Sequence, residues 1–221
     1  MENLLAPADT IARTLSGFAN RMRLDQVPVE VSLRARHLIL DAIGCALAAR
    51  QEEFATRYAQ ATYALSEGQG ERVVIGFSKR LAQRDAALLN GVLCHGLDYD
   101  DTHMTGIIHL TVSVLPTVLS LAGQRGASGA DMLAAYIAGV ETGARIASAT
   151  QGGLHAHGFH PTAVVGAFAS TLAAGRLLGA IPLADWRRIL FPAWPVDVTV
   201  ETLMESVMAM VLKTSGGEIP F

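Results

Sequence analysis

The feature that most constrains the fold is a succession of segments whose apolar residues recur at helical spacing. The segment PTAVVGAFASTLAAGRLLGA, which begins at Pro161, is rich in alanine and glycine. Small residues along one face let helices approach each other closely, so a helix of this composition is typical of the buried centre of a bundle. We therefore predict a mainly α-helical bundle.

Several helix ends can be predicted from capping residues. Ser128, with Asp131 three residues later, is a plausible N-cap for a long helix through Ala149. Pro28 and Pro161 suit the first turn of a helix. Other helices are expected at about 10–19, 53–66 and 110–122, and from 82 onward. The short β-like run GQGERVVIGFSKR is not expected to build a sheet.

Composition excludes some functions. The chain has 221 residues, of which 51% are hydrophobic and 17% charged, whereas a typical soluble domain is about 25% charged. Some apolar surface is therefore expected to be buried against another chain or segment. The net charge of −3 provides no basic surface for nucleic acid.

Neither a membrane span nor secretion is expected. The first ten residues carry acidic residues and lack the basic region of a signal peptide. The apolar stretch from Met104 to Gly123 contains His109 and Pro116, so we predict no transmembrane helix there. Cys45 and Cys94 lie in apolar helical patterns and are predicted to be buried free thiols of a cytoplasmic protein.

The first candidate site is a cluster of polar residues between positions 95 and 109. If the helix from residue 82 persists, Asp98 lies on one face with His95 and Thr102. A buried carboxyl among other carboxylates can have a raised pKa and act as a general acid or base. Alternatively, the segment is a solvated helix end whose aspartates cap the next element. The cluster comprises His95, Asp98, Asp100, Asp101, Thr102, His103 and His109.

Common motifs of other site classes are missing from the sequence. The spacing of His103 and His109 differs from that of a zinc-binding HExxH helix. An EF-hand would need a glycine and a terminal glutamate that this segment lacks. No GxSxG, P-loop or dinucleotide-binding glycine pattern is present. We therefore predict no bound metal and no nucleotide.

The second candidate site is QGGLHAHGFHPT, which contains His155, His157 and His160 before Pro161. A histidine beside a helix N-terminus is well placed to bind an anion, because free N–H groups and the helix dipole favour negative charge. Alternatively, the segment is a connector with exposed histidines.

Positive charge for such an anion would come mainly from histidine and arginine. Lys79 and Lys213 are the only lysines in the sequence. The available donors near the middle of the chain are Arg145, Arg176 and the histidines. Arg145 is also interpreted as a helix-surface or ion-pair residue.

Four stretches, taken together, resemble the MmgE/PrpD family. They occur in the family's order and cover roughly residues 8–180. The family acts on small di- or tricarboxylates without a metal or organic cofactor, as 2-methylcitrate dehydratase, cis-aconitate decarboxylase or iminodisuccinate epimerase. The stretches are RARHLILDAIGCALAA, DAALLNGVLCHGLDYDDTH, GASGADMLAAYIAGVETGARIA and GFHPTAVVGAFASTLAAGRLLG.

The resemblance implies roles for individual residues. Asp98 and Thr102 of LDYDDTH match active-site positions, as do His109 and the His160 of GFHPT. The implied roles are proton transfer for Asp98 or a histidine, and carboxylate binding for Thr102 and the other histidine. His103 is a further candidate. The resemblance also implies a homodimer with its site between a large helical domain and a smaller α+β domain.

Departures from the family pattern concern the C-terminal part. Family members carry a catalytic lysine in a Lys-x-x-His-x-Gly-like stretch, whereas LKTSGGEIP around Lys213 does not reproduce it. We therefore predict a family-like helical domain over residues 1–180, without the smaller domain. Residues 181–221 form a divergent tail of the kind that a truncated or frameshifted copy would show.

Three functional hypotheses follow from the resemblance. The first is a lyase similar to 2-methylcitrate dehydratase that is incomplete as it stands, and the second is a decarboxylase or epimerase of the same family. The third is an inactive fragment or a helical dimerisation protein, because an interdomain site that lacks one wall loses positioning and charge stabilisation.

Overall fold

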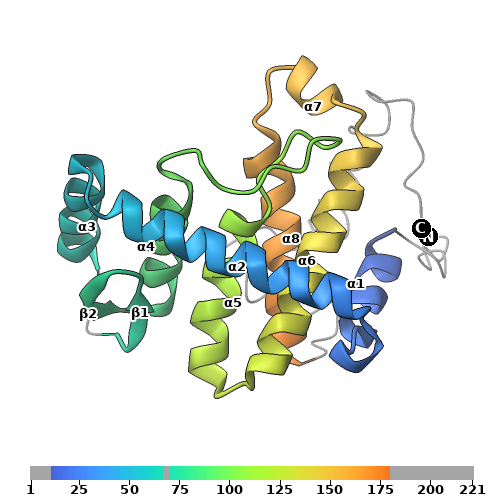
Figure 1. The fold of residues 1–221 in the computed structure, drawn as a ribbon, viewed down its shortest axis with the longest axis horizontal. Helices are drawn as coiled ribbons and strands as arrows, with labels where there is room; N and C mark the ends of the chain where they lie inside the picture. The colour runs from blue at the N-terminus through green and yellow to red at the C-terminus, as the bar shows by residue number, and fades with distance from the viewer. Residues whose placement is uncertain (1–10, 67–69, 180–221) are drawn as a thin grey trace, which may run out of the picture.

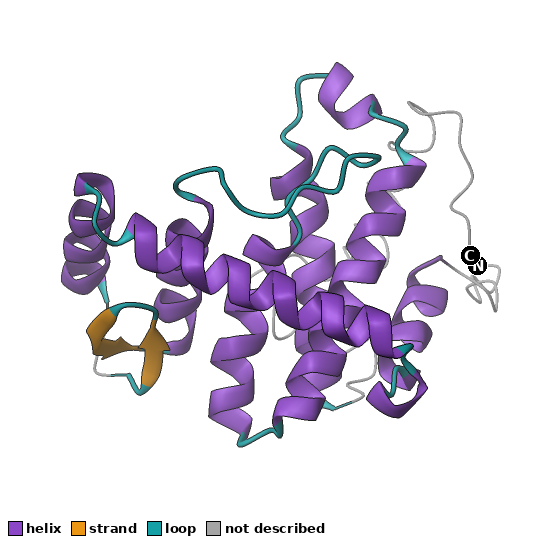
Figure 2. Ribbon diagram, in the orientation of Figure 1, coloured by secondary structure: helices purple, strands orange, loops and turns teal. Residues whose placement is uncertain are grey.

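The structure, a computed structural model, describes residues 11–66 and 70–179. The predicted divergent tail over residues 181–221, with Lys213, lies outside the described residues. Within them the fold is mainly α-helical, as the periodicity predicts. Figure 2 shows helices throughout and strands only at one edge.

The described chain contains eight α-helices and one short 3-10 helix. Most helices lie where the sequence pattern predicts them, within a few residues at each end. The short helix α7 falls inside QGGLHAHGFHPT, the segment of the second candidate site, where no helix was predicted before Pro161. The helices are α1 (Ile11–Arg21), η1 (Leu24–Gln26), α2 (Val29–Ala49), α3 (Glu53–Leu65), α4 (Gln83–His95), α5 (Thr111–Arg125), α6 (Gly129–Ala149), α7 (Gly153–Ala156) and α8 (Pro161–Leu178).

Local signals account for several of these ends. The Ser128 hydroxyl accepts a hydrogen bond from the Asp131 backbone N–H at 3.1 Å, which caps α6 as predicted. Pro161 is the first residue of α8. Gly126 ends α5 in the left-handed conformation, with φ 61°, which glycine adopts without steric cost.

Three helices form the centre of the bundle. Helix α8 packs against α5 and α6, and α2 runs across this group in Figure 1. Gly139 of α6 has no side chain at the crossing, where a Cβ would lie 2.9 Å from the Ala169 carbonyl oxygen and 2.9 Å from the Ala173 Cβ. The small residues of α6 and α8 thus allow the close helix approach that composition predicts.

A two-stranded antiparallel hairpin lies at one edge of the bundle. Strands β1 (Arg72–Val74) and β2 (Phe77–Leu81) pair in the stretch where no sheet was expected. Asn90 of α4 fixes the hairpin, because its side chain accepts from the Ile75 N–H at 2.8 Å and donates to the Val73 carbonyl at 2.9 Å. This support comes from a residue distant in sequence, so the local pattern could not reveal it.

One described helix, α8, is long and apolar enough to cross a membrane by length and composition. Its packing against α5 and α6 places it among the core helices of the bundle. The stretch from Met104 to Gly123 is not such a helix, since part of it is the loop before α5.

Candidate functional site

The first candidate cluster lies mainly on a loop, residues 96–110, between α4 and α5. Figure 1 shows this loop crossing the end of the bundle where α7 and the start of α8 lie. Inside the loop, His103 and Ile108 form an isolated β-bridge, and the His103 Nδ1 accepts the Gly106 N–H at 3.1 Å. His103 therefore has a structural role in holding this turn.

The helical relation expected between Asp98 and Thr102 is wrong. Helix α4 ends at His95, and Asp98 lies in the left-handed region with φ 56°. Asp98 and Thr102 are both exposed, and neither lines the hollow that His95 and His160 line. Since the helix does not persist, the spacing of these residues no longer places them on a common face.

Asp100 is the centre of the cluster. Its side chain is 0% exposed, so the interpretation of a solvated helix end is wrong for this residue. Its Oδ1 lies 3.0 Å from Nδ1 of His95, and its Oδ2 lies 3.2 Å from Nδ1 of His109. The two imidazole rings are 5.0 Å apart between centroids. One buried carboxylate thus contacts both rings at once.

His109 is held from several sides. Its backbone N–H donates to the Thr162 hydroxyl of α8 at 3.1 Å, and its Nε2 lies 3.7 Å from Oδ1 of Asp98. The Nδ1 is close to Asp100 but has no well-directed hydrogen bond. Catalytic hydrogen bonds are often poorly aligned without substrate and tighten in the complex.

His160 brings the second candidate segment to the same place. It is the N-cap residue of α8, and its exposed ring is nearly parallel to that of His95, with centroids 6.3 Å apart. His155 and His157 are exposed, and the His157 Nδ1 bonds to the Gly153 carbonyl at 2.8 Å. The connector interpretation therefore fits these two, whereas His160 joins the cluster.

An open hollow of about 620 Å³ lies beside His95 and His160. It is lined by His95, His160, Ser113, Thr117 and Thr162, together with apolar residues of α4, α5 and α8. Because its lining contains no lysine or arginine, the imidazoles of His95 and His160 and the positive end of the α8 helix dipole are the groups of the hollow that suit an anion.

The comparisons with known proteins agree with the motifs in this site. Residues 13–182 match the MmgE/PrpD N-terminal domain. The chain belongs to the MmgE/PrpD family. The motifs LDYDDTH and GFHPT, which carry the site, both fall inside the matched region.

The curated relatives it resembles are named as cis-aconitate decarboxylases. The chain is 37% identical over 171 residues to the cis-aconitate decarboxylase of Aspergillus terreus, covering 75% of this chain and 35% of that protein. It is 32% identical over 184 residues to a cis-aconitate decarboxylase-like protein of Aspergillus oryzae (80% and 38% covered), and 28% over 175 residues to human cis-aconitate decarboxylase (77% and 36% covered). The chain thus spans little more than a third of the length of these relatives.

Asp101 is the titratable group of this MmgE/PrpD site with a shifted pKa. Burial raises the pKa of the Asp101 carboxyl, Asp100 raises it further, and hydrogen bonds from the hydroxyl and backbone N–H of Thr111 oppose the shift. The Thr111 hydroxyl also lies 2.6 Å from the Tyr136 hydroxyl, in the core. Asp101 interacts with Thr111, the first residue of α5, but this helix has no side-chain capping hydrogen bond at its N-cap residue, so the capping alternative stays a prediction.

Four side chains of the first candidate cluster form a set that could hold a metal ion. One donor atom from each of His95, Asp98, Asp100 and His109 lies within 4.8 Å of the others, and two imidazoles with two carboxylates are a donor set typical of zinc or iron. However, Asp100 is already contacted by both imidazoles. The absence of a metal, expected from the sequence and the family, stays a prediction.

The arginines proposed as anion donors lie elsewhere in this MmgE/PrpD domain. Arg145 forms an ion pair with Glu141, with Nη2 and Oε1 2.6 Å apart. This agrees with its interpretation as an ion-pair residue. Arg176 lines a different hollow with Asp25 and Asp131. Neither lines the hollow beside the histidines.

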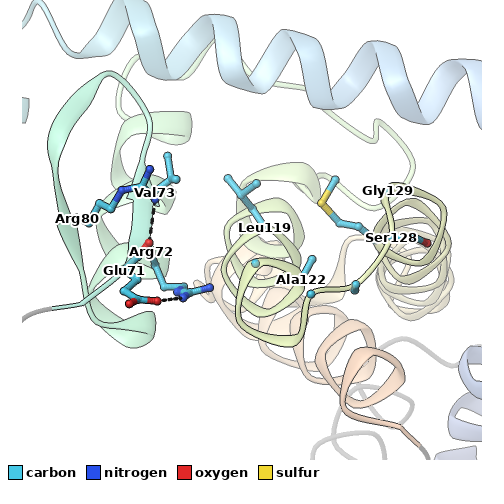
Figure 3. A pocket seen from close by; sticks show the side chains of 12 residues that line it. Glu71, Arg72, Val73, Arg80, Leu119, Ala122, Ser128 and Gly129 are labelled. Atoms are coloured by element: carbon cyan, nitrogen blue, oxygen red, sulfur yellow. Dashed lines mark hydrogen bonds and ion pairs between the residues drawn. The ribbon is translucent and has the colours of Figure 1, made fainter.

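A larger hollow of about 800 Å³ lies between the hairpin and the turn before α6. Figure 3 shows Glu71, Arg72 and Arg80 on its hairpin side. Arg72 pairs with Glu71 at 3.2 Å, and Arg80 donates to the Glu71 backbone carbonyl at 3.0 Å. The two arginines on its hairpin side are thus engaged by Glu71, and none of the family-motif residues lines this hollow.

Motif matching alone placed Asp98, Thr102, His109 and His160 in the site and omitted His95 and Asp100. Both omitted residues were within the polar cluster, so their type was visible. The burial of Asp100 distinguishes it from its neighbours, and no local pattern revealed that burial.

Proposed function

We propose that this chain provides the histidine–carboxylate part of an MmgE/PrpD lyase site for a small polycarboxylate, with cis-aconitate as the first substrate to test. The observation that carries the proposal is that His95 and His160 line one hollow, while the buried Asp100 contacts both His95 and the neighbouring ring of His109. The named activity of the relatives supports the choice of cis-aconitate.

The chemistry of a decarboxylation matches these parts. The bond between a carbon atom and one carboxylate breaks, CO₂ leaves, and the electron pair left on the carbon chain takes up one proton. An imidazolium within reach of that carbon can supply the proton. His160 and the positive end of the α8 helix dipole can hold a remaining carboxylate, because a helix N-terminus favours negative charge.

The other family reactions are alternatives for the same site. Dehydration of 2-methylcitrate and epimerisation of a dicarboxylate also move a proton next to a carboxylate, so the histidine cluster suits them too. A non-catalytic role as a helical dimerisation protein is the alternative of a different class. We propose a cytoplasmic homodimer in each case, following the family resemblance.

The test is an assay of the purified chain with cis-aconitate, followed by CO₂ release, and in parallel with 2-methylcitrate, followed by loss of water. We expect CO₂ release from cis-aconitate, strongly reduced by His160→Ala and by Asp98→Ala. His155→Ala is the matched control, since His155 lies outside the hollow and, unlike Asp98, is not part of the cluster with His95, Asp100 and His109. Absence of turnover at high protein concentration would contradict a catalytic function for this chain, and turnover unaffected by both site variants would contradict the location of the site.

A further inference from the structure

We propose that Asp100 is a positioning residue that fixes the tautomer of two histidines, by accepting the Nδ1–H of both His95 and His109. The Asp100 Oδ1 lies 3.0 Å from the His95 Nδ1, and its Oδ2 lies 3.2 Å from the Nδ1 of both His95 and His109. This residue has no part in the motif assignment, which names its neighbour Asp98.

The chemistry of the groups determines the direction of these contacts. A carboxylate has only acceptors, and a neutral imidazole carries a hydrogen on one of its two nitrogens. An ionised carboxylate that is 0% exposed needs hydrogen-bond donors, because burying an unpaired charge is costly. Nδ1–H on both rings satisfies Asp100, whereas Nε2–H tautomers would leave lone pairs facing lone pairs.

The consequence is that Nε2 of each ring is the nitrogen that gains or loses a proton. His95 lines the hollow, and the His109 Nε2 lies 3.7 Å from the exposed Asp98 carboxylate. Two bases with the same tautomer are thereby prepared side by side. The tautomer assignment stands without the proposed function, whereas the use of these nitrogens for proton transfer to a substrate rests on it.

The two contacts differ in quality. The His95 Nδ1 is within hydrogen-bond distance of both Asp100 oxygens, at 3.0 and 3.2 Å. The His109 Nδ1 is as close to Oδ2 but is not well directed toward it. We therefore expect a more firmly fixed tautomer for His95 than for His109.

The test reads the tautomers directly by long-range ¹H–¹⁵N NMR of the full chain labelled with ¹⁵N-histidine, at a pH where the rings are neutral. His95→Gln and His109→Gln variants assign the two ring signals. We expect both rings protonated at Nδ1. In Asp100→Asn, an NH₂ group replaces one oxygen and donates rather than accepts, so one of the two rings is expected to switch to Nε2–H.

Asp25→Asn is the matched control, because Asp25 is an exposed carboxylate paired with Arg23, away from the histidines. It is expected to leave both ring signals unchanged. Nε2–H on both rings in the parent protein would overturn the proposal, as would unchanged tautomers in a folded Asp100→Asn variant. If the Asp100→Asn variant does not fold, the tautomers of His95 and His109 in the parent protein alone test the proposal.

Turnover provides a second readout that separates this proposal from the proposed function. If cis-aconitate is decarboxylated, Asp100→Asn is expected to lower kcat by orders of magnitude with a small effect on KM, as the same change does to the histidine-orienting aspartate of serine proteases, where the loss is about 10⁴-fold. Equal kcat in both proteins would contradict the role in catalysis. If no substrate is turned over, the proposed function fails while the NMR result still decides the tautomers.

Discussion

Thr162→Val tests the connection between the site loop and helix α8. Thr162 is 5% exposed, and its hydroxyl accepts a hydrogen bond from the His109 N–H at 3.1 Å. Valine keeps the shape and has a similar helix propensity but removes the acceptor. A buried N–H without a partner costs about 1–3 kcal/mol, so we expect the free energy of unfolding to fall by about that amount in urea denaturation followed by circular dichroism.

Hydrogen exchange at the His109 amide shows whether the reason is correct. Thr162→Ser is the matched control: it keeps the hydroxyl and loses one methyl group, worth about 0.8 kcal/mol. We expect slow exchange of the His109 amide in the parent and in Thr162→Ser, and faster exchange in Thr162→Val. If the amide exchanges equally slowly in all three proteins, it has another partner and the reasoning is refuted.

Three further predictions concern packing, pH and metal. Gly139→Ala should lower the free energy of unfolding by about 1–3 kcal/mol, because its Cβ would lie 2.9 Å from the Ala169 carbonyl oxygen; Gly44→Ala, whose Cβ meets nothing within 4 Å, should raise it by about 0.5–1 kcal/mol. Denaturation melts of both variants check this pair, and equal destabilisation would contradict it. Burial raises the pKa of Asp101 above 3.8, so its contribution to stability is present below that pH and is lost as pH rises through the folded-state value. The free energy of unfolding of Asp101→Asn minus that of the parent should therefore be larger at pH 7 than at pH 3. A difference that stays constant between these pH values would contradict the raised pKa of Asp101. Dialysis against EDTA should leave any decarboxylase activity unchanged, because Asp100 already has two imidazole partners; activity restored only by added zinc would show that the cluster is a metal site.

The helices were largely predictable because their signals are local. The Ser128 cap, Pro161 at the start of α8 and the helical spacing of apolar residues each act within a few residues of the chain, so the sequence displays them directly. The hairpin at β1 and β2 was not predicted, because Asn90 supports it from fifteen residues away.

For the candidate site, the sequence identified which kinds of residue gather and which family they belong to. The cluster from His95 to His109 and the motif around His160 both contribute to one location, but the expected continuation of helix α4 through Asp98 and Thr102 is wrong. That expectation assumed a local geometry, and the loop after His95 has another one because its Asp98 adopts a left-handed conformation.

The sequence by itself determined the helical class, the family and the residue types available for acid–base chemistry. Only the tertiary structure decided that Asp100, among neighbouring aspartates, is the buried one that contacts two histidines, and that His160 joins them from the start of α8. Burial arises when segments distant in sequence pack together. The same carboxylate is a solvated surface group or a buried partner of imidazoles according to what covers it.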